Sequence, residues 1–279
     1  MRERLKHAII WCVKLEKMSL IITIYLNDAI VMASDSRTTL TTSTIAQNGS
    51  VVINSFPFSD STNKTFVAPN GCGVSTCGDS SYQNKPIAGF IEKFFASSIK
   101  KNTSIFDLCT LITDYFTNLD GSKCAIFHIG GYELNANNEY DAMVYRCVTG
   151  ANKVITKVST NSQGAMWDGE TETLTRLIKP VIVNPEEIEV NNLKLLLGNK
   201  PAVQFDAIVL EKSKAIRLNE DSIQWQLMSV KDAIDFINFA FETTINHMRF
   251  QATNKTVGGP IDVLLIKPSE VNWVKKKKI

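Results

Sequence analysis

The segment "EKMSLIITIYLNDAIVMASDSRTT", residues 16–39, contains a serine, an aspartate and an arginine at spacings that could support catalysis. Ser19 directly follows Met18, and Asp35 and Arg37 come later in the same segment. A serine hydroxyl is a weak nucleophile unless a neighbouring base accepts its proton. The first question is therefore which group could act as that base.

Histidine is the usual base for a serine nucleophile, but its distribution here does not favour that role. The chain has three histidines, His7, His128 and His247. His128 falls in an apolar run typical of a strand, and His247 falls near the end of an expected helix, so neither is expected to act as a catalytic base. The motifs G-x-S-x-G, H-E-x-x-H and the glycine-rich nucleotide-binding loops are also absent from the sequence.

A free α-amino group at Ser19 would supply a base without a histidine. Such an amine has a reference pKa of about 7.7–8.0, which is close to neutral. The mechanism requires Ser19 to be the first residue of the mature chain, a cation that keeps the pKa of the amine low, and a carboxylate that holds the cation. The alternative is structural: Ser19 begins a strand, and Asp35 and Arg37 form an ion pair at a strand end.

The same segment resembles the start of mature proteasome β-subunits and of the related chamber of a bacterial ATP-dependent protease, which are N-terminal nucleophile (Ntn) hydrolases. In that family a threonine opens the mature chain, two strands follow, and an acidic residue lies sixteen positions after the nucleophile, commonly with an arginine two positions further on. Ser19, Asp35 and Arg37 occupy these positions. The resemblance implies that Ser19 is the nucleophile and that Asp35 is catalytic.

Three later stretches extend the resemblance. "NKTFVAPNGCGVSTCGDSS" is similar to the strand that carries the family's catalytic lysine and to the next strand, which supplies the oxyanion-hole N–H. "GAMWDGETETLTRLI" is similar to a loop that leads into a helix and carries further active-site groups, and "TNKTVGGPIDVLLI" is similar to the closing loop and strand. The resemblance implies that Lys64 is catalytic, with an insertion around 48–62, although Lys64 could also be a surface lysine. It implies supporting roles for Arg37, Ser75, Thr76, Cys77, Gly78, Asp168, Gly169, Asn254 and Gly258.

The sequence departs from the family's pattern at four positions. Serine replaces threonine at position 19, Asp168 stands where the family has a serine, Asn254 stands where it has an aspartate, and Val257 stands where it has a serine. The resemblance implies a proteasome-like hydrolase that cleaves amide bonds, most simply those of peptides or proteins, and that forms a ring-like homo-oligomer without a metal or cofactor. An unfoldase partner is not identified. The departures keep two alternatives open: an inactive assembly subunit, and an amidohydrolase of a small non-peptide substrate.

The elements that would position these residues follow from hydrophobic periodicity and capping signals. Strands are expected at 19–26, 29–34, 50–56, 64–68, 72–77, 123–132, 140–148, 152–159 and 260–267. Helices are expected at 84–99, from Ser104 onward, at about 169–179 and from Ser229 to about Met248. Residues 180–228 show no clear pattern. This order predicts an α+β protein, a four-layer αββα sandwich, with residues 19–279 as a single domain.

Residues 1–18 are expected to be an N-terminal extension with two alternative origins. Translation could start at Met18, with removal of that methionine exposing Ser19. Alternatively, the extension could be a propeptide that the protein itself cleaves.

The composition limits the classes of partner and the cellular compartment that are expected for the protein. Lys+Arg 30 against Asp+Glu 28 leaves a net charge of +2, so a nucleic-acid partner is not expected. The basic run 275–278 is interpreted as a solvated tail. The six cysteines show no C-x-x-C spacing, so no zinc site is predicted, and free thiols in a reducing cytoplasm are expected. No apolar run is long enough to span a membrane.

Overall fold

Two five-stranded antiparallel sheets form the centre of the molecule. The computed structural model describes residues 19–45, 51–178, 223–251 and 254–278. In the first sheet the order is β12 (Gly164–Gly169), β1 (Leu20–Tyr25), β2 (Ile30–Ser34), β13 (Asp262–Lys267) and β14 (Glu270–Lys275). In the second sheet the order is β11 (Val154–Val158), β10 (Tyr140–Val148), β9 (Ala125–Leu134), β6 (Gly73–Gly78) and β5 (Thr65–Val67).

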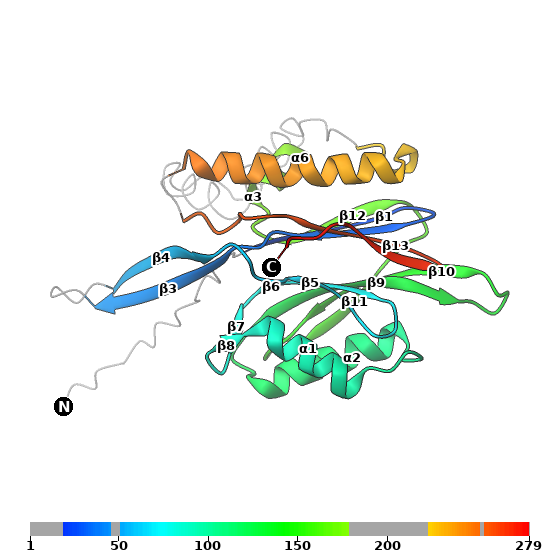
Figure 1. Ribbon diagram of the computed structural model, residues 1–279, viewed down its shortest axis with the longest axis horizontal. Helices are drawn as coiled ribbons and strands as arrows, with labels where there is room; N and C mark the ends of the chain where they lie inside the picture. The colour runs from blue at the N-terminus through cyan, green and yellow to red at the C-terminus, as the bar shows by residue number, and fades with distance from the viewer. Residues whose placement is uncertain (1–18, 46–50, 179–222, 252–253, 279) are drawn as a thin grey trace, which may run out of the picture.

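Helices lie on the outer faces of the two sheets (Figure 1). Helices α3 (Glu172–Ile178) and α6 (Val230–Arg249) lie over the first sheet, and α1 (Ile87–Ser98) and α2 (Ile105–Leu119) lie over the second. A short 3-10 helix, η1, spans Trp225–Leu227. Apolar side chains fill the space beneath each helical layer and also the space between the sheets, where Ile30, Met32 and Leu264 are fully buried. The burial of these three layers holds both sheets face to face.

Local sequence signals explain where the helices begin. Ser104 accepts a hydrogen bond from the backbone N–H of Asp107, which satisfies a donor in the first turn of α2. Ser229 and Asp232 form a reciprocal capping box at the start of α6. The hairpin of β1 and β2 turns at Asn27 and Asp28, as the sequence predicts. The antiparallel sheets, with helices in separate segments of the chain, confirm the predicted α+β class.

Three elements differ from the sequence-based expectation. Residues 164–169 form strand β12, which pairs with β1, where a loop leading into a helix was expected. Strand β14 follows β13, so the strand at 260–267 is not the last one. Strand β3 (Thr38–Ile45) pairs with β4 (Val51–Ser59) in a hairpin that projects from the body, and this hairpin occupies much of the expected insertion (Figure 1). A second, minimal hairpin joins β7 (Ser81–Tyr82) and β8 (Lys85–Pro86).

Three lysines of the basic run 275–278 are exposed, as the interpretation as a solvated tail predicts, but Lys277 is buried and corrects it at that position. Lys275 ends β14, and Lys277 is buried in an ion pair with Asp262. A buried carboxylate stabilises a lysine that would otherwise remain in water, and periodicity alone cannot show such a partner. The extension 1–18 and most of 180–228 lie outside the described residues. Among the described helices, none is long and apolar enough to cross a membrane.

Candidate active site

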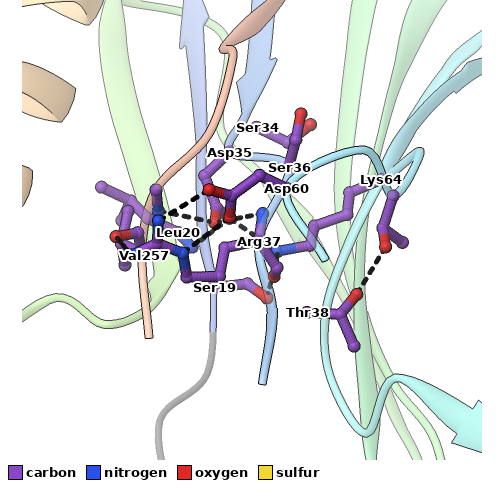
Figure 2. Close-up of polar contacts among 12 residues, drawn as sticks. Ser19, Leu20, Ser34, Asp35, Ser36, Arg37, Thr38, Asp60, Lys64 and Val257 are labelled. Carbon is purple, nitrogen blue, oxygen red and sulfur yellow. Dashed lines mark hydrogen bonds and ion pairs between the residues drawn. The ribbon is translucent and has the colours of Figure 1, made fainter. Parts of the chain in front are cut away.

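Asp35 is the residue around which the candidate site is organised (Figure 2). Its carboxylate follows β2 and is fully buried. Oδ1 accepts hydrogen bonds from the N–H of Leu20 at 3.1 Å and from Nζ of Lys64 at 2.8 Å, and Oδ2 accepts from the N–H groups of Arg37 at 3.0 Å and Gly258 at 3.1 Å. Four donors therefore bind one buried carboxylate. Their hydrogen bonds offset the free-energy cost of burying its charge.

Lys64 joins Asp35 to Ser19. Its Nζ donates hydrogen bonds to Ser19 Oγ at 2.7 Å and to the carbonyl oxygen of Arg37 at 2.5 Å, in addition to Asp35. The side chain of Lys64 is 4% exposed and Ser19 is 3% exposed. Burial lowers the pKa of Lys64, and the charge and hydrogen bond of Asp35 oppose that effect. The ammonium group is thus held in direct contact with a buried hydroxyl.

The backbone of Ser19 is unusual for a residue with a side chain. Its φ is +76°, in the left-handed region that L-residues other than glycine rarely adopt. The carbonyl oxygen of Ser19 accepts a hydrogen bond from the N–H of Glu170 at 2.7 Å. Gly169 lies directly against this carbonyl, and a Cβ added to Gly169 would be 2.1 Å from it. Glycine at position 169 therefore allows the backbones of β12 and Ser19 to approach closely.

Arg37 anchors the loop before β13 to the end of β2. Its guanidinium makes a bidentate ion pair with Asp60, at 2.7 and 2.8 Å, and donates to the carbonyl oxygens of Lys255 and Val257. A Cβ on Gly258 would be 2.4 Å from Cζ of Arg37, so glycine allows the loop to pack on the guanidinium. Arg37 is close to the Ser19 cluster, but its side chain holds the surrounding loops and does not touch the hydroxyl.

Strand β6 places Ser75, Thr76, Cys77 and Gly78 beside Lys64. The N–H of Thr76 donates to the carbonyl oxygen of Lys64 at 2.8 Å, and the hydroxyl of Ser75 bonds that of Thr65 at 2.9 Å. The Cys77 thiol is buried, and burial raises its pKa well above the ordinary value. Cys77 is therefore a protonated thiol at neutral pH. Gly78 has a φ of +90°.

Asp168 does not join the Ser19 cluster, and its side chain faces a different network. Arg146 pairs with it through two bonds of 2.6 and 2.7 Å, and His128 Nε2 lies 2.9 Å from it. The second nitrogen of His128 bonds the hydroxyl of Thr23 at 3.0 Å. The pairing of β12 with β1 places Asp168 opposite Ile21, and its side chain extends toward β9 and β10 of the other sheet.

Electrostatics explain the charge states in this second network. Burial opposes ionisation of Asp168, but the hydrogen bonds from His128 and Arg146 outweigh it and lower the pKa of Asp168 to about 2. Burial lowers the pKa of His128, although Asp168 acts in the opposite direction. The neutral imidazole of His128 is therefore held in the core between the hydroxyl of Thr23 and the carboxylate of Asp168.

The two remaining departures from the family pattern differ in their surroundings. Asn254 is exposed, and its carbonyl oxygen accepts a bond from the N–H of Thr256. Val257 is 1% exposed and packs in the apolar cluster beneath α6. Neither residue places a carboxylate or a hydroxyl beside Ser19.

Sequence reasoning missed several residues that shape the site. Asp60 binds Arg37, and Asp262 pairs with Lys277 near the same end of the sheets. A charged residue within or just before a strand, like Asp262 in "PIDVLLIK", is the signal that could have identified the second pair, because an inward-facing charge needs a partner. Among the described residues, no group of three or more histidine, cysteine, aspartate or glutamate side chains has a geometry that could hold a metal ion.

Comparisons with known proteins show similarity to solved structures, but none in sequence. No protein-family model matches the chain, and no curated protein matches it in sequence. Among solved structures, the chain is similar to an Anbu (Gly-1) mutant from Hyphomicrobium sp. strain MC1, with a TM-score of 0.46 and 11% sequence identity; the match covers 93% of this chain and 86% of the other. A similarity at this TM-score and identity does not show the family or the function of the chain.

Proposed function

We propose that this chain is a proteasome-like N-terminal nucleophile hydrolase that cleaves amide bonds of peptides, with Ser19 as the nucleophile. The observation that carries the proposal is the buried contact of 2.7 Å between Lys64 Nζ and Ser19 Oγ, with Asp35 bound to the same nitrogen. A nucleophile in contact with a second group that a third group orients is the general signature of covalent catalysis. Two antiparallel sheets between two helical layers are also the arrangement that the resemblance predicts for this family.

The backbone of Ser19 supports cleavage of the bond between Met18 and Ser19. A φ of +76° costs a non-glycine residue of order 1–3 kcal/mol. An N-terminal residue has no preceding peptide bond and therefore no φ restriction of this kind. Cleavage would relieve the restriction at Ser19 and create the α-amino group that the mechanism requires.

The proposed reaction has two half-reactions that share one base. Ser19 Oγ attacks the carbonyl carbon of the substrate, and its proton goes to the neutral α-amino group of Ser19. Lys64 stays protonated and donates its hydrogen bond to Oγ. The protonated base then gives this proton to the leaving amine as the C–N bond breaks, which leaves an acyl ester on Ser19. A water molecule, deprotonated by the same amine, hydrolyses the ester and restores the hydroxyl. Asp35 remains ionised throughout and orients Lys64.

Strand geometry favours Gly78 as the donor to the oxyanion. Successive N–H groups along a strand point to opposite edges, and the N–H of Thr76 points to Lys64. The N–H of Gly78 is therefore expected on the same edge, beyond the point where β5 ends its pairing at Thr65 and Ser75. A donor at this edge, adjacent to Lys64, would stabilise the negative charge that develops on the substrate oxygen. Glycine suits the position, because a Cβ would lie 2.6 Å from the carbonyl oxygen of Cys124.

A covalent labelling experiment tests the proposal. A protein that begins at Met18 should be processed to Ser19 and should form an adduct with a peptide epoxyketone, which reacts with a hydroxyl and its adjacent amine. Intact mass spectrometry and peptide mapping identify the modified residue. Ser19→Ala should abolish labelling. A protein that retains residues 1–18 should also fail to react, because an amide nitrogen cannot accept the proton. Equal labelling of Ser19→Ala and wild type would refute the role of Ser19.

The surroundings of Asn254 and Val257 favour a second candidate, an inactive assembly subunit of the same fold. These positions supply no polar group to the α-amino group of Ser19 in the described structure. We infer self-association into a ring-like assembly for either candidate, and a cytoplasmic location. Sedimentation velocity at micromolar concentration tests the assembly. A processed, assembled protein that forms no adduct with the epoxyketone supports the inactive subunit, whereas adduct formation excludes it.

A further inference from the structure

The ion pair of Asp168 joins the two central sheets, which lie face to face (Figure 1). Asp168 belongs to β12 of the first sheet, and its carboxylate accepts bonds of 2.6 and 2.7 Å from Arg146 of β10 in the second sheet. His128 of β9 lies 2.9 Å from the same carboxylate and is the cross-strand partner of Arg146. Two neighbouring side chains of one sheet therefore bind one carboxylate of the other. The paired bonds from the guanidinium fix its direction as well as its distance.

Strand β12 depends on such contacts for its position. Residues 164–169 have little intrinsic preference for a strand. In the described part of the chain, β12 is the outer strand of the first sheet and pairs with β1 alone. Asp168 lies next to the last residue of β12. The bonds from Arg146 and His128 therefore hold the end of a strand that backbone pairing supports from one side.

The backbone at this end of β12 contacts Ser19. Gly169 is the register partner of Leu20, and a Cβ on Gly169 would lie 2.1 Å from the carbonyl oxygen of Ser19. The N–H of Glu170 donates to the same oxygen at 2.7 Å. One residue separates Asp168 from Glu170, so the place of the carboxylate governs the place of this donor.

We propose that Arg146 is a positioning residue of the candidate site, which holds the end of β12 against Ser19 through its ion pair with Asp168. The proposal rests on the proposed function for its catalytic meaning. Arg146 does not touch the hydroxyl of Ser19 and acts through the backbone. Asp168 fixes the end of β12, and the bond from Glu170 then orients the carbonyl group of Ser19 and the Cα that carries the nucleophile. Lys64 binds the hydroxyl itself, so Ser19 is held at two separate atoms.

The exposure of Arg146 makes it the suitable residue for a test. Its side chain is 34% exposed and lines a cavity of about 280 Å³, together with Trp167 and Thr175. Replacement of Arg146 therefore removes the ion pair without leaving a void in the core. Replacement of the fully buried His128 would also disturb the packing between the sheets.

Hydrogen exchange at the Glu170 amide tests the structural link without any measurement of activity. Exchange is followed by mass spectrometry with fragmentation that resolves single residues. In Arg146→Met this amide should exchange about tenfold faster than in the wild type, because the bonds to a charged group no longer oppose local opening of β12. The amides of α2, on the outer face of the second sheet, should change less, which separates local opening from global unfolding. An unchanged rate at Glu170 would overturn the inference.

Labelling kinetics test the catalytic meaning of this link. The dependence of epoxyketone labelling on reagent concentration gives a maximal rate and a half-saturating concentration. In Arg146→Met the maximal rate should fall about 10–100-fold, since a misplacement of about 1 Å can have an effect of this size. The half-saturating concentration should stay near the wild-type value. If the maximal rate stays at the wild-type value, Arg146 is not a positioning residue of the site.

Two further variants serve as references for the labelling. Arg146→Lys keeps the charge but cannot form two parallel bonds, so its maximal rate should lie between those of Arg146→Met and the wild type. Lys153→Met removes a surface cation and should label like the wild type. An equal loss of rate in Lys153→Met and Arg146→Met would mean that the ion pair with Asp168 has no special role, and the inference would be wrong.

A double variant covers the case in which Arg146→Met does not fold. Arg146→Met combined with Asp168→Asn leaves no unpaired carboxylate, and it should still show faster exchange at Glu170 and slower labelling. If this double variant matches the wild type in both measurements, the inference is wrong. If exchange at Glu170 rises in Arg146→Met but the processed wild type forms no adduct, the proposed hydrolase is rejected and the link from Arg146 to Ser19 stands.

Discussion

Lys64 Nζ donates to Ser19 Oγ at 2.7 Å and to Asp35 Oδ1 at 2.8 Å, so one buried nitrogen connects a hydroxyl with a carboxylate. The three residues come from positions 19, 35 and 64 of the chain and meet where β1, β2 and β5 begin or end. Burial strengthens the interactions among them, because little water screens their charges. This geometry leads to distinct expectations for Lys64 and for Asp35.

Replacement of Lys64 by methionine should slow the labelling of Ser19 at least about 100-fold, since a positioned acid or base commonly contributes about 10²–10⁴-fold. Methionine keeps much of the buried stem and removes the ammonium group. The second-order rate constant for epoxyketone labelling, followed by mass spectrometry, provides the measurement. Lys153→Met is the matched control, because Lys153 pairs with Asp114 on the surface. Equal labelling rates for Lys64→Met and the control would contradict the role of Lys64.

Replacement of Asp35 by asparagine should destabilise the fold strongly. The change leaves the buried Lys64 without its charge partner, and removal of one member of a buried ion pair typically costs about 3–5 kcal/mol. Urea unfolding followed by circular dichroism measures the free energy of unfolding. Asp114→Asn, which breaks the exposed pair with Lys153, should change that free energy by less than about 1 kcal/mol. Similar losses in both variants would mean that the Asp35–Lys64 pair contributes no more than a surface pair.

Much of the fold follows from local signals in the sequence. The hairpin of β1 and β2 has β-branched runs on both sides of Asn27 and Asp28, and Ser104 and Ser229 cap α2 and α6 as their sequences predict. Strand β12 was missed because its six residues, "GAMWDG", contain two glycines and an aspartate, which are depleted in strands. Its pairing with β1 is a tertiary contact that overrides this preference.

The candidate site shows the same division between local and long-range causes. The positions of Ser19, Asp35 and Lys64 could be proposed from their spacing and the family resemblance. The partners of Asp168 and Asp262 could not, because each pairs with a residue that only the folded sheets bring close. Arg146 reaches Asp168 from the facing sheet, and Lys277 reaches Asp262 after the turn between β13 and β14. Sequence spacing carries no information on such contacts.

Acidification should destabilise the protein partly through His128. Burial lowers the pKa of His128 below its unfolded value of 6.5, so the unfolded chain binds more protons as the pH falls below that value. The stabilising contribution is therefore present above pH 6.5 and is lost as the pH falls toward the lowered pKa, by at most about 1.4 kcal/mol per pH unit. Melting temperatures between pH 7.5 and 5 provide the measurement.

His128→Gln is the control for this titration. Glutamine can accept a bond from Thr23 and donate one to Asp168, but it does not titrate. The melting temperature of this variant should fall less between pH 7.5 and 5 than that of the wild type. An identical pH dependence in both proteins would show that His128 does not contribute to acid sensitivity.

Replacement of Gly169 by alanine should disturb the backbone that holds Ser19. Gly169 has a φ of +95°, and a Cβ there would be 2.1 Å from the carbonyl oxygen of Ser19. The left-handed conformation alone costs alanine of order 1–3 kcal/mol, and the contact with a backbone atom forces β12 away from β1. The variant should lose stability in urea and label more slowly at Ser19. Gly89→Ala is the same chemical change in an exposed turn of α1 with no atom within 4 Å of the new Cβ, and it should stabilise the protein by about 0.5–1 kcal/mol. If Gly169→Ala is as stable as Gly89→Ala and labels at the wild-type rate, the close approach of β12 to Ser19 has no importance for the site.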